Sequence, residues 1–226
     1  MEEHHLQVQR TARYYTLGTL TENTTHLWIA CHGYGQLASR LIRKFEGVDL
    51  QRHFIVAPEG LSRFYWQGVT GQVAASWMTK ADRLHEIEDY SNYLQELLEL
   101  FCHQRPDLKV VLFGFSQGCA TIMRWMMAKF PKVDRAVLWA GLFPEDISYR
   151  PHYRYLEQTK FHFIYGTEDE YLTPERQAMH EALMQQEGLE VAVQSFEGKH
   201  HIDRAVLESL VRAISASDPR EAPDLS

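Results

Sequence analysis

Short apolar runs recur along the chain and are separated by longer segments in which apolar positions return with helical spacing. The runs have the length of strands and are rich in Val, Ile, Phe and Trp: residues 27–31, 54–57, 110–115, 136–140, 161–165 and 191–193. Because polar positions within them are few, the runs are typical of strands buried on both faces of a sheet. The pattern therefore predicts a sheet that helices cover on both sides.

The segments between the runs predict amphipathic helices. The clearest covers residues 82–104, where one stripe is apolar against Glu and Gln: Leu84, Ile87, Tyr90, Leu94, Leu97, Leu98 and Phe101. Further helices are expected over about residues 37–46, 117–130, 174–187 and 202–214. Strands that alternate with helices form crossover connections, so we expect an α/β fold with a mainly parallel, doubly wound sheet.

The ends and the long connections add to this outline. Residues 14–20 and 25–30 flank the turn-like stretch TENT, which predicts an antiparallel N-terminal hairpin at the sheet edge. The long connections at 58–80 and 142–160 are expected to carry function but are too short for a large cap domain. No repeat or linker divides the chain, so we expect one domain over residues 1–215 and a flexible tail at 216–226.

Composition narrows the class of protein. The chain has 226 residues, of which 45% are hydrophobic, and a formal net charge of −7 with no basic run, which disfavours nucleic acid as a partner. It lacks both an apolar segment of about 20 residues and the order of a signal peptide at its start. The three cysteines fit neither a disulfide framework nor a zinc site. We therefore expect a cytoplasmic protein without integral membrane association.

The strongest chemical motif is GFSQG at residues 114–118, which directly follows one predicted strand and directly precedes a predicted helix. In a G-x-S-x-G turn of this kind, the serine stands on a tight bend where side chains two positions away would clash. The turn would raise the Ser116 hydroxyl above the N-terminus of the helix, where a developing oxyanion is favoured. Alone the pentapeptide is a common turn, but its setting indicates a nucleophile.

An acid and a histidine follow in the order that a serine nucleophile needs. The acidic loop GTEDE at 166–170 follows the strand at 161–165, and the histidine pair at 200–201 precedes the last helix. Ser, then acid, then His is the chain order of the α/β-hydrolase triad. Taken alone, such an acidic loop is more often a solvated loop that caps the following helix, and the serine upstream favours the catalytic interpretation. The spacing does not choose between His200 and His201.

An oxyanion site is expected in the loop that follows the strand at 27–31. This loop reads HGYGQ at 32–36, and its glycines allow the backbone to approach a substrate oxygen closely. We expect the backbone amides of Tyr34 and Gln117 to donate to the oxyanion. A phosphate-binding loop would need a lysine that is missing here. Metal catalysis has a weaker case, because His4, His5 and the pair at 200–201 find no convincing further ligands in the sequence.

Together these motifs resemble the phospholipase/carboxylesterase family of small α/β-hydrolases, which includes acyl-protein thioesterases. The resemblance covers about residues 25–214 and rests on HGYG at 32–35, APEG at 57–60, ASWMT at 75–79, GFSQG at 114–118, GTED at 166–169 and GKHHI at 198–202. It implies an α/β-hydrolase fold and a serine esterase that uses no metal or cofactor. It also implies that Ser116 is the nucleophile, Asp169 the acid and His200 the base.

The expected reaction is hydrolysis of small-molecule carboxylic esters with short to medium acyl groups, with thioesters and lysophospholipids as further candidates. Aromatic side chains in and beyond the long connections are expected to wall the acyl pocket: Phe64, Tyr65, Trp66, Trp77 and Phe143. Two alternatives stay open, a non-catalytic α/β-hydrolase that binds a small ligand and a peptidase or other acyl hydrolase on the same fold. A homodimer is also left open.

Overall fold

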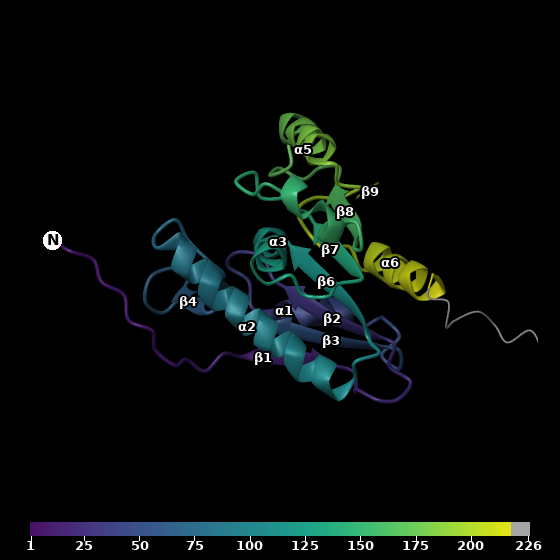
Figure 1. Ribbon diagram of the computed structural model, residues 1–226, viewed down its shortest axis with the longest axis horizontal. Coiled ribbons are helices and arrows are strands. Elements are labelled where there is room, and N and C mark those ends of the chain that lie inside the picture. The colour runs from purple at the N-terminus through teal and green to yellow at the C-terminus, as the bar shows by residue number, and fades with distance from the viewer. Residues whose placement is uncertain (218–226) are drawn as a thin grey trace, which may run out of the picture.

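A seven-stranded sheet forms the centre of the computed structural model, which describes residues 1–217 (Figure 1). Across the sheet the strands are β1 (Tyr14–Leu17), β3 (His53–Pro58), β2 (His26–Cys31), β6 (Lys109–Phe115), β7 (Arg135–Trp139), β8 (Lys160–Gly166) and β9 (Val191–Phe196). All are parallel except β1, which runs antiparallel to β3. The carboxyl ends of β2, β6 and β8 therefore meet at one edge of the sheet.

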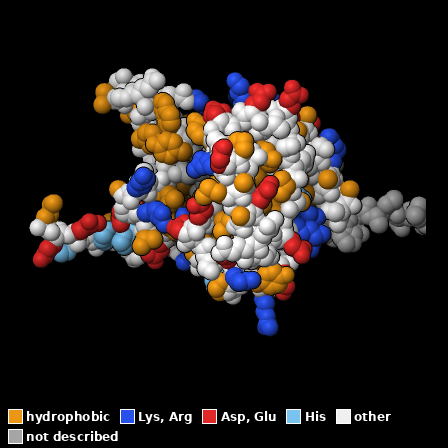
Figure 2. All heavy atoms as spheres, turned by 90° about the horizontal axis from the view of Figure 1, so that it is seen from above, with side chains coloured by type: hydrophobic (Ala, Val, Ile, Leu, Met, Phe, Trp, Pro, Cys, Tyr) orange, Lys and Arg blue, Asp and Glu red, His pale blue; other side chains and the backbone are white. Residues whose placement is uncertain are grey.

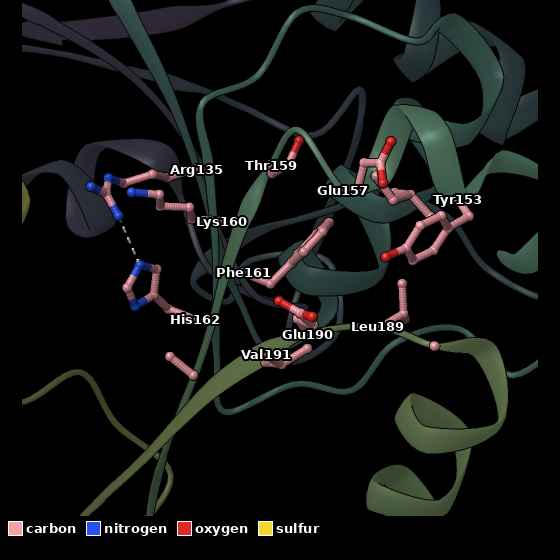
Figure 3. Close-up of a pocket in the computed structure, with 13 residues that line it drawn as sticks. Arg135, Tyr153, Glu157, Thr159, Lys160, Phe161, His162, Leu189, Glu190 and Val191 are labelled. Carbon is pink, nitrogen blue, oxygen red and sulfur yellow. Dashed lines mark hydrogen bonds between the residues drawn. The ribbon is translucent and has the colours of Figure 1, made fainter.

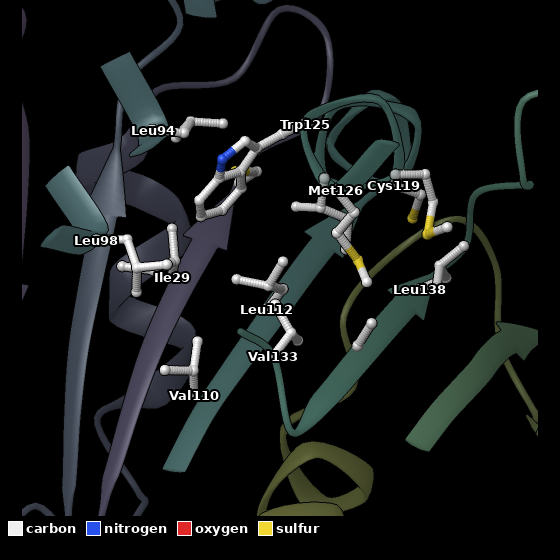
Figure 4. Close-up of a cluster of buried hydrophobic side chains, with 14 of the residues drawn as sticks. Ile29, Leu94, Leu98, Val110, Leu112, Cys119, Trp125, Met126, Val133 and Leu138 are labelled. Atoms are coloured by element: carbon white, nitrogen blue, oxygen red, sulfur yellow. The ribbon is translucent and has the colours of Figure 1, made fainter. Parts of the chain in front are cut away.

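Helices cover both faces of the sheet and bury two separate apolar clusters. One cluster joins the sheet to α2 (Arg83–Gln104), α3 (Gln117–Lys129), α4 (Tyr153–Leu156) and α5 (Pro174–Glu187). The other joins it to α1 (Ala38–Leu41), the short 3-10 helix η1 (Ile42–Phe45) and α6 (Arg204–Ala216). In Figure 4, Ile29 of β2 and Leu112 of β6 face Leu94 of α2 and Trp125 of α3. This is the α/β-hydrolase fold, mainly parallel, doubly wound and without a large cap domain.

The predicted N-terminal hairpin is wrong, although an antiparallel strand does stand at the edge. β1 pairs with β3, from Tyr14 opposite Pro58 to Leu17 opposite Ile55, and not with β2. The reason is that both edges of β2 are already taken by parallel strands, β3 on one side and β6 on the other. These strands are almost wholly apolar, and their pairing buries more apolar surface than a polar hairpin would.

Three local expectations also needed correction. The run at 191–193 was predicted to be buried on both faces, but β9 is the edge strand and Val193 is 49% exposed. The helix expected at 37–46 is split into α1 and η1. Leu84 was placed in the apolar stripe of α2 but is 73% exposed, since burial of this helix begins only at Tyr90.

The long connections carry structure of their own. Residues 58–80 contain a two-stranded antiparallel sheet of β4 (Ser62–Tyr65) and β5 (Val73–Ser76), which the sequence did not predict. The second connection contains the 3-10 helix η2 (Arg150–His152) and α4. Among residues 1–217, no helix combines the length and the apolar character that a bilayer span requires. Of the tail predicted at 216–226, residues 218–226 lie outside the described residues.

Candidate active site

Ser116 stands on a sharp turn between β6 and α3. Its backbone has φ 53° and ψ −115°, in a region that residues other than glycine rarely occupy. The Ser116 N–H donates to the carbonyl of Trp139 at 2.9 Å, and the Ser116 carbonyl accepts from the Cys119 N–H at 3.0 Å. A conformation of this kind costs about 1–3 kcal/mol and is held mostly at functional sites. The strand, turn and helix are those that GFSQG predicted.

The glycines around Ser116 are required by the closeness of neighbouring backbone. A Cβ atom on Gly114 would lie 2.5 Å from the carbonyl oxygen of Gly118. A Cβ atom on Gly118 would collide with the carbonyl oxygen of Cys31 at the end of β2. A Cβ atom on Gly141 would collide with the carbonyl oxygen of Ser116 itself. Glycine at these positions lets the turn sit directly against the ends of β2 and β7.

Asp169 and His200 form a hydrogen-bonded pair at the same edge of the sheet. His200 Nδ1 lies 2.7 Å from Asp169 Oδ2, and the Asp169 side chain has no exposed surface. Its other oxygen, Oδ1, accepts from the Tyr171 N–H at 2.9 Å. Because both carboxylate oxygens are engaged, Asp169 is fixed as an acceptor toward His200. A neutral imidazole that donates to this acceptor carries its proton on Nδ1 and leaves Nε2 as an acceptor.

Aromatic rings fix the position of His200 beside the serine turn. Its ring centroid lies 5.0 Å from that of Phe115, the residue before Ser116, and 4.7 Å from that of Tyr171. His201 points elsewhere, since its Nδ1 lies 3.0 Å from the Lys199 carbonyl. His200 is therefore the histidine of the pair that faces the acid. Sequence reasoning missed Tyr171, whose place two residues after Asp169 was the one available signal.

The backbone amide of Tyr34, in the loop after β2, lies among amides that are hydrogen-bonded within the protein. The N–H of Gly33 donates to Gln36 Oε1 at 3.2 Å, that of Gly35 to the Ala75 carbonyl at 2.9 Å, and that of Gln36 to the Gly33 carbonyl at 3.2 Å. Within residues 1–217, the Tyr34 N–H has no such partner. An oxyanion site requires a backbone donor of this kind that no protein acceptor occupies.

The backbone amide of Gln117 was predicted to be an oxyanion donor, and its side chain also has a structural role. Its N–H opens α3 directly after Ser116, where a helix leaves its first amides without intrahelical partners. Its side chain reaches the segment after β5: Nε2 donates to the Met78 carbonyl at 2.9 Å, and Oε1 accepts from the Trp77 N–H at 3.2 Å. This side chain fixes residues 77–78 above the start of α3.

Buried His32 joins the loop after β2 to the segments around it. The Gly60 N–H donates to His32 Nε2 at 2.9 Å, and the Trp77 indole N–H donates to the His32 carbonyl at 2.8 Å. Burial lowers the pKa of His32 below its usual value, which keeps the ring neutral and able to accept the Gly60 hydrogen bond. His32 therefore supports the loop that carries Tyr34.

Three aromatic side chains meet beside this loop. The ring of Tyr34 lies 5.6 Å from that of Phe64 and 5.7 Å from that of Trp66, between centroids. A Cβ atom on Gly35 would collide with the Trp66 ring. Tyr65 and Trp66 are half exposed, and Figure 2 shows hydrophobic side chains gathered on the projecting part at the upper left. We call Tyr34, Phe64 and Trp66 the aromatic lip.

Two of the predicted pocket residues lie in the core instead. Trp77 is 1% exposed, and its ring packs against those of His32 and Tyr90. Phe143 is also 1% exposed, and its ring packs against Phe161, among others. Both are enclosed on all sides, so their expected role as pocket walls gives way to a packing role.

A separate cavity lies away from this site. A cavity of about 490 Å³ is lined by residues that include Arg135 and Lys160, the first residues of β7 and β8 (Figure 3). Ser116 and Asp169 follow the carboxyl ends of β6 and β8, at the opposite edge of the sheet. Since ligands of open α/β sheets bind beyond the carboxyl ends of the strands, we assign the reacting groups to that edge and not to the cavity.

The sequence profile described as Phospholipase/Carboxylesterase matches residues 19–217. The chain belongs to the phospholipase/carboxylesterase family. Membership makes it an esterase-type α/β-hydrolase, as the resemblance in the sequence predicted. A search of curated proteins gave no match.

Solved structures similar to this family member support the fold. Acyl-protein thioesterase 2 of Zea mays has a TM-score of 0.73 at 14% identity, over 91% of this chain and 99% of its own. A Bacillus cereus carboxylesterase has a TM-score of 0.63 at 13% identity, over 92% and 95%. Arabidopsis thaliana SOBER1 has a TM-score of 0.63 at 14% identity, over 84% and 99%. At these identities the likeness establishes the fold alone.

Proposed function

We propose that the protein is a serine hydrolase that cleaves carboxylic esters through an acyl-enzyme. The observation that carries the proposal is the His200–Asp169 pair, packed on Phe115 next to the strained turn that holds Ser116. A serine hydroxyl is a weak nucleophile near neutral pH and needs such a base, itself oriented by a carboxylate. Family membership adds independent support for ester substrates.

In the proposed mechanism, Ser116 Oγ attacks the ester carbonyl while His200 Nε2 accepts the hydroxyl proton. The oxyanion accepts hydrogen bonds from the Tyr34 and Gln117 amides, and loss of one such donor typically raises the barrier by about 2.7–4 kcal/mol. His200 then gives the proton to the departing alcohol or thiol. Water attacks the acyl-enzyme with His200 again as base, which releases the acid and restores Ser116.

The surroundings of the site favour a small acyl group. The aromatic lip is half exposed and offers flat apolar contact on the side of the oxyanion loop, and no large cap encloses it. We therefore propose short to medium acyl esters as substrates, with thioesters and lysophospholipids in the same class. A clear preference for long-chain triglyceride would contradict this.

The first experiment labels the purified protein with a fluorophosphonate and locates the adduct by mass spectrometry. p-Nitrophenyl acetate and butyrate turnover is measured in the same preparation, with Ser116→Ala as the matched control. An adduct on Ser116, with turnover that Ser116→Ala abolishes, is the expected result. An unlabelled Ser116 in folded protein would overturn the proposal in favour of a non-catalytic binding protein, and cleavage of amides but not esters in favour of a peptidase.

We also propose a cytoplasmic location. Cys31, Cys102 and Cys119 are all free thiols, and Cys31 and Cys119 are buried. Burial raises the pKa of the Cys31 and Cys119 thiols, which keeps both protonated and unreactive. Free cysteines without disulfides are typical of a reducing compartment.

A further inference from the structure

Two histidines and an aspartate from distant parts of the sequence meet at the start of α2. His5 Nε2 lies 3.2 Å from Asp82 Oδ2, and His85 Nδ1 lies 2.6 Å from Asp82 Oδ1. The imidazole rings of His5 and His85 stack with centroids 4.0 Å apart. Among residues 1–217, this is the one group of three such side chains whose ligand atoms all lie within 4.8 Å of one another. The proposed esterase mechanism uses none of them.

The spacing of these atoms is close to that of a coordination shell. Metal–ligand distances of 2.0–2.2 Å in a tetrahedral zinc site put neighbouring ligand atoms about 3.3–3.6 Å apart. The 3.2 Å between His5 Nε2 and Asp82 Oδ2 is close to this range. The side chains of His5, Asp82 and His85 are 43%, 44% and 52% exposed, so tight packing does not hold them in their present rotamers.

A fourth donor is within reach. Glu3 Oε1 lies 3.3 Å from His5 Nε2, on the same extended N-terminal segment. Two carboxylates and two imidazoles make a complete tetrahedral set of ligands. His4 does not belong to the group, since its Nε2 faces Glu2 instead, at 3.6 Å.

The local charge also favours a cation. The N-terminus of a helix carries about half a positive charge, which opposes cation binding at the start of α2. The carboxylates of Asp82 and Glu3 outweigh that partial charge, and Glu88 and Asp89 on the first turns of α2 add to the negative field at His85. The choice of ion follows from the donors, because imidazole suits Zn²⁺, Cu²⁺ and Ni²⁺, whereas Ca²⁺ and Mg²⁺ prefer oxygen ligands.

We propose that Glu3, His5, Asp82 and His85 form a surface site for one divalent transition-metal ion, Zn²⁺ first among them. The ion would join the N-terminal segment, which has no helix or strand before Tyr14, to the start of α2. The site is separate from Ser116, Asp169 and His200, and its existence does not depend on the proposed esterase activity. It also departs from the sequence-based expectation that the chain holds no metal.

The direct test is titration of the full chain, without a polyhistidine tag, with ZnCl2 by isothermal calorimetry. One equivalent of Zn²⁺ is expected to bind. His5→Ala, His85→Ala and Asp82→Asn should each weaken binding by about tenfold or more, the low end of the effect of losing even an outer-shell partner. Asparagine is a matched replacement because Asp82 has φ 51°, a conformation that asparagine tolerates. His4→Ala, one residue away, should leave the affinity unchanged.

A second measurement follows proteolysis of the N-terminal segment that precedes β1. Trypsin cleaves after Arg10, which lies between the proposed ligand His5 and β1. Zn²⁺ should slow this cleavage in the wild type and in His4→Ala but not in His85→Ala, which also controls for any effect of zinc on trypsin. Absence of zinc binding in the wild type would overturn the proposal. So would binding that survives all three substitutions, because the ion would then lie elsewhere, for example on the exposed histidine pair at 200–201.

Discussion

Gln117 Nε2 donates a hydrogen bond to the carbonyl oxygen of Met78 at 2.9 Å. The residue that follows the proposed nucleophile therefore links the 58–80 connection to the start of α3. Its backbone amide and its side chain therefore have different tasks. The amide is the proposed donor to the oxyanion. The side chain does not take part in the reaction itself but positions residues 77–78 through its hydrogen bonds.

Replacing Gln117 by alanine separates these tasks. Gln117→Ala keeps the backbone N–H but removes the hydrogen bonds to Met78 and Trp77. The free energy of unfolding should fall by about 1–3 kcal/mol, because the partner groups near the core lose their hydrogen bonds. Ester turnover should persist at a reduced rate. Thermal unfolding and p-nitrophenyl butyrate kinetics measure the two effects, and abolished turnover in a folded variant would mean that the side chain itself takes part in the reaction.

Asp169→Asn tests the orientation of His200. The amide that replaces the carboxylate can donate toward Nδ1, which favours the tautomer that carries its proton on Nε2 and cannot act as a base. In a serine protease the equivalent change lowers kcat by about 10⁴-fold, and we expect a loss of this order. The matched control is His201→Ala, since His201 faces the Lys199 carbonyl and not the acid. If His201→Ala were the variant that lost activity, the assignment of the base would be wrong.

Gly118→Ala tests the fit between the serine turn and β2. The added methyl group would meet the carbonyl oxygen of Cys31, a backbone atom that cannot swing aside. We expect destabilisation of about 1–3 kcal/mol or more, together with loss of turnover as the turn shifts. Gly47→Ala is the control, because its methyl group would meet only the flexible end of the Glu208 side chain. Equal melting temperatures for the two variants would refute this reading of the turn.

Stability should fall as the pH is lowered from about 6.5 toward 4, because of buried histidines. Burial lowers the pKa of His180 to about 4, below the value of about 6.5 that the unfolded chain has. Between these two values the unfolded state binds the proton and the folded state does not, so protonation favours unfolding. The loss is at most about 1.4 kcal/mol per pH unit for this histidine.

His180→Gln isolates this contribution. His180 Nε2 accepts from the Phe143 N–H at 3.0 Å, and a glutamine oxygen can accept the same hydrogen bond without titrating. Urea unfolding at pH 7, 5.5 and 4.5 should show a shallower dependence on pH for this variant than for the wild type. His53, whose pKa burial also lowers to about 4, should keep part of the slope. An unchanged slope would show that His180 does not titrate in this way.

The sequence predicted the parts of the fold that local patterns determine. The buried strands and the helices α2, α3 and α5 follow from apolar spacing, and the serine turn follows from two glycines that flank Ser116. Pairing between distant strands is not a local property, which is why β1 was placed beside β2 and not beside β3. The same limit applies to β9, because an apolar run does not state that it will lie at the edge of the sheet.

Side-chain surroundings were the harder part of the site. Trp77 and Phe143 were predicted to wall a pocket because they stand in or beyond long connections, yet both pack into the core. The local sequence around an aromatic loop residue is the same whether its side chain contacts a ligand or packs into the core. The group of His5, Asp82 and His85 was beyond sequence reasoning for a related reason, since Asp82 lies 77 positions after His5 in the chain.

The direction of β1 and the end of α6 place the two ends of the fold at opposite edges of the sheet. Tyr14, at the start of β1, pairs with Pro58 at the carboxyl end of β3, so the chain enters the sheet at the edge where Ser116 and Asp169 lie (Figure 1). α6 finishes at the other edge, where Ser215 contacts His53 at the start of β3. A fusion partner or surface linkage attached through the N-terminus would therefore join the fold at the edge that holds the proposed catalytic residues, whereas attachment after α6 would join it at the opposite edge.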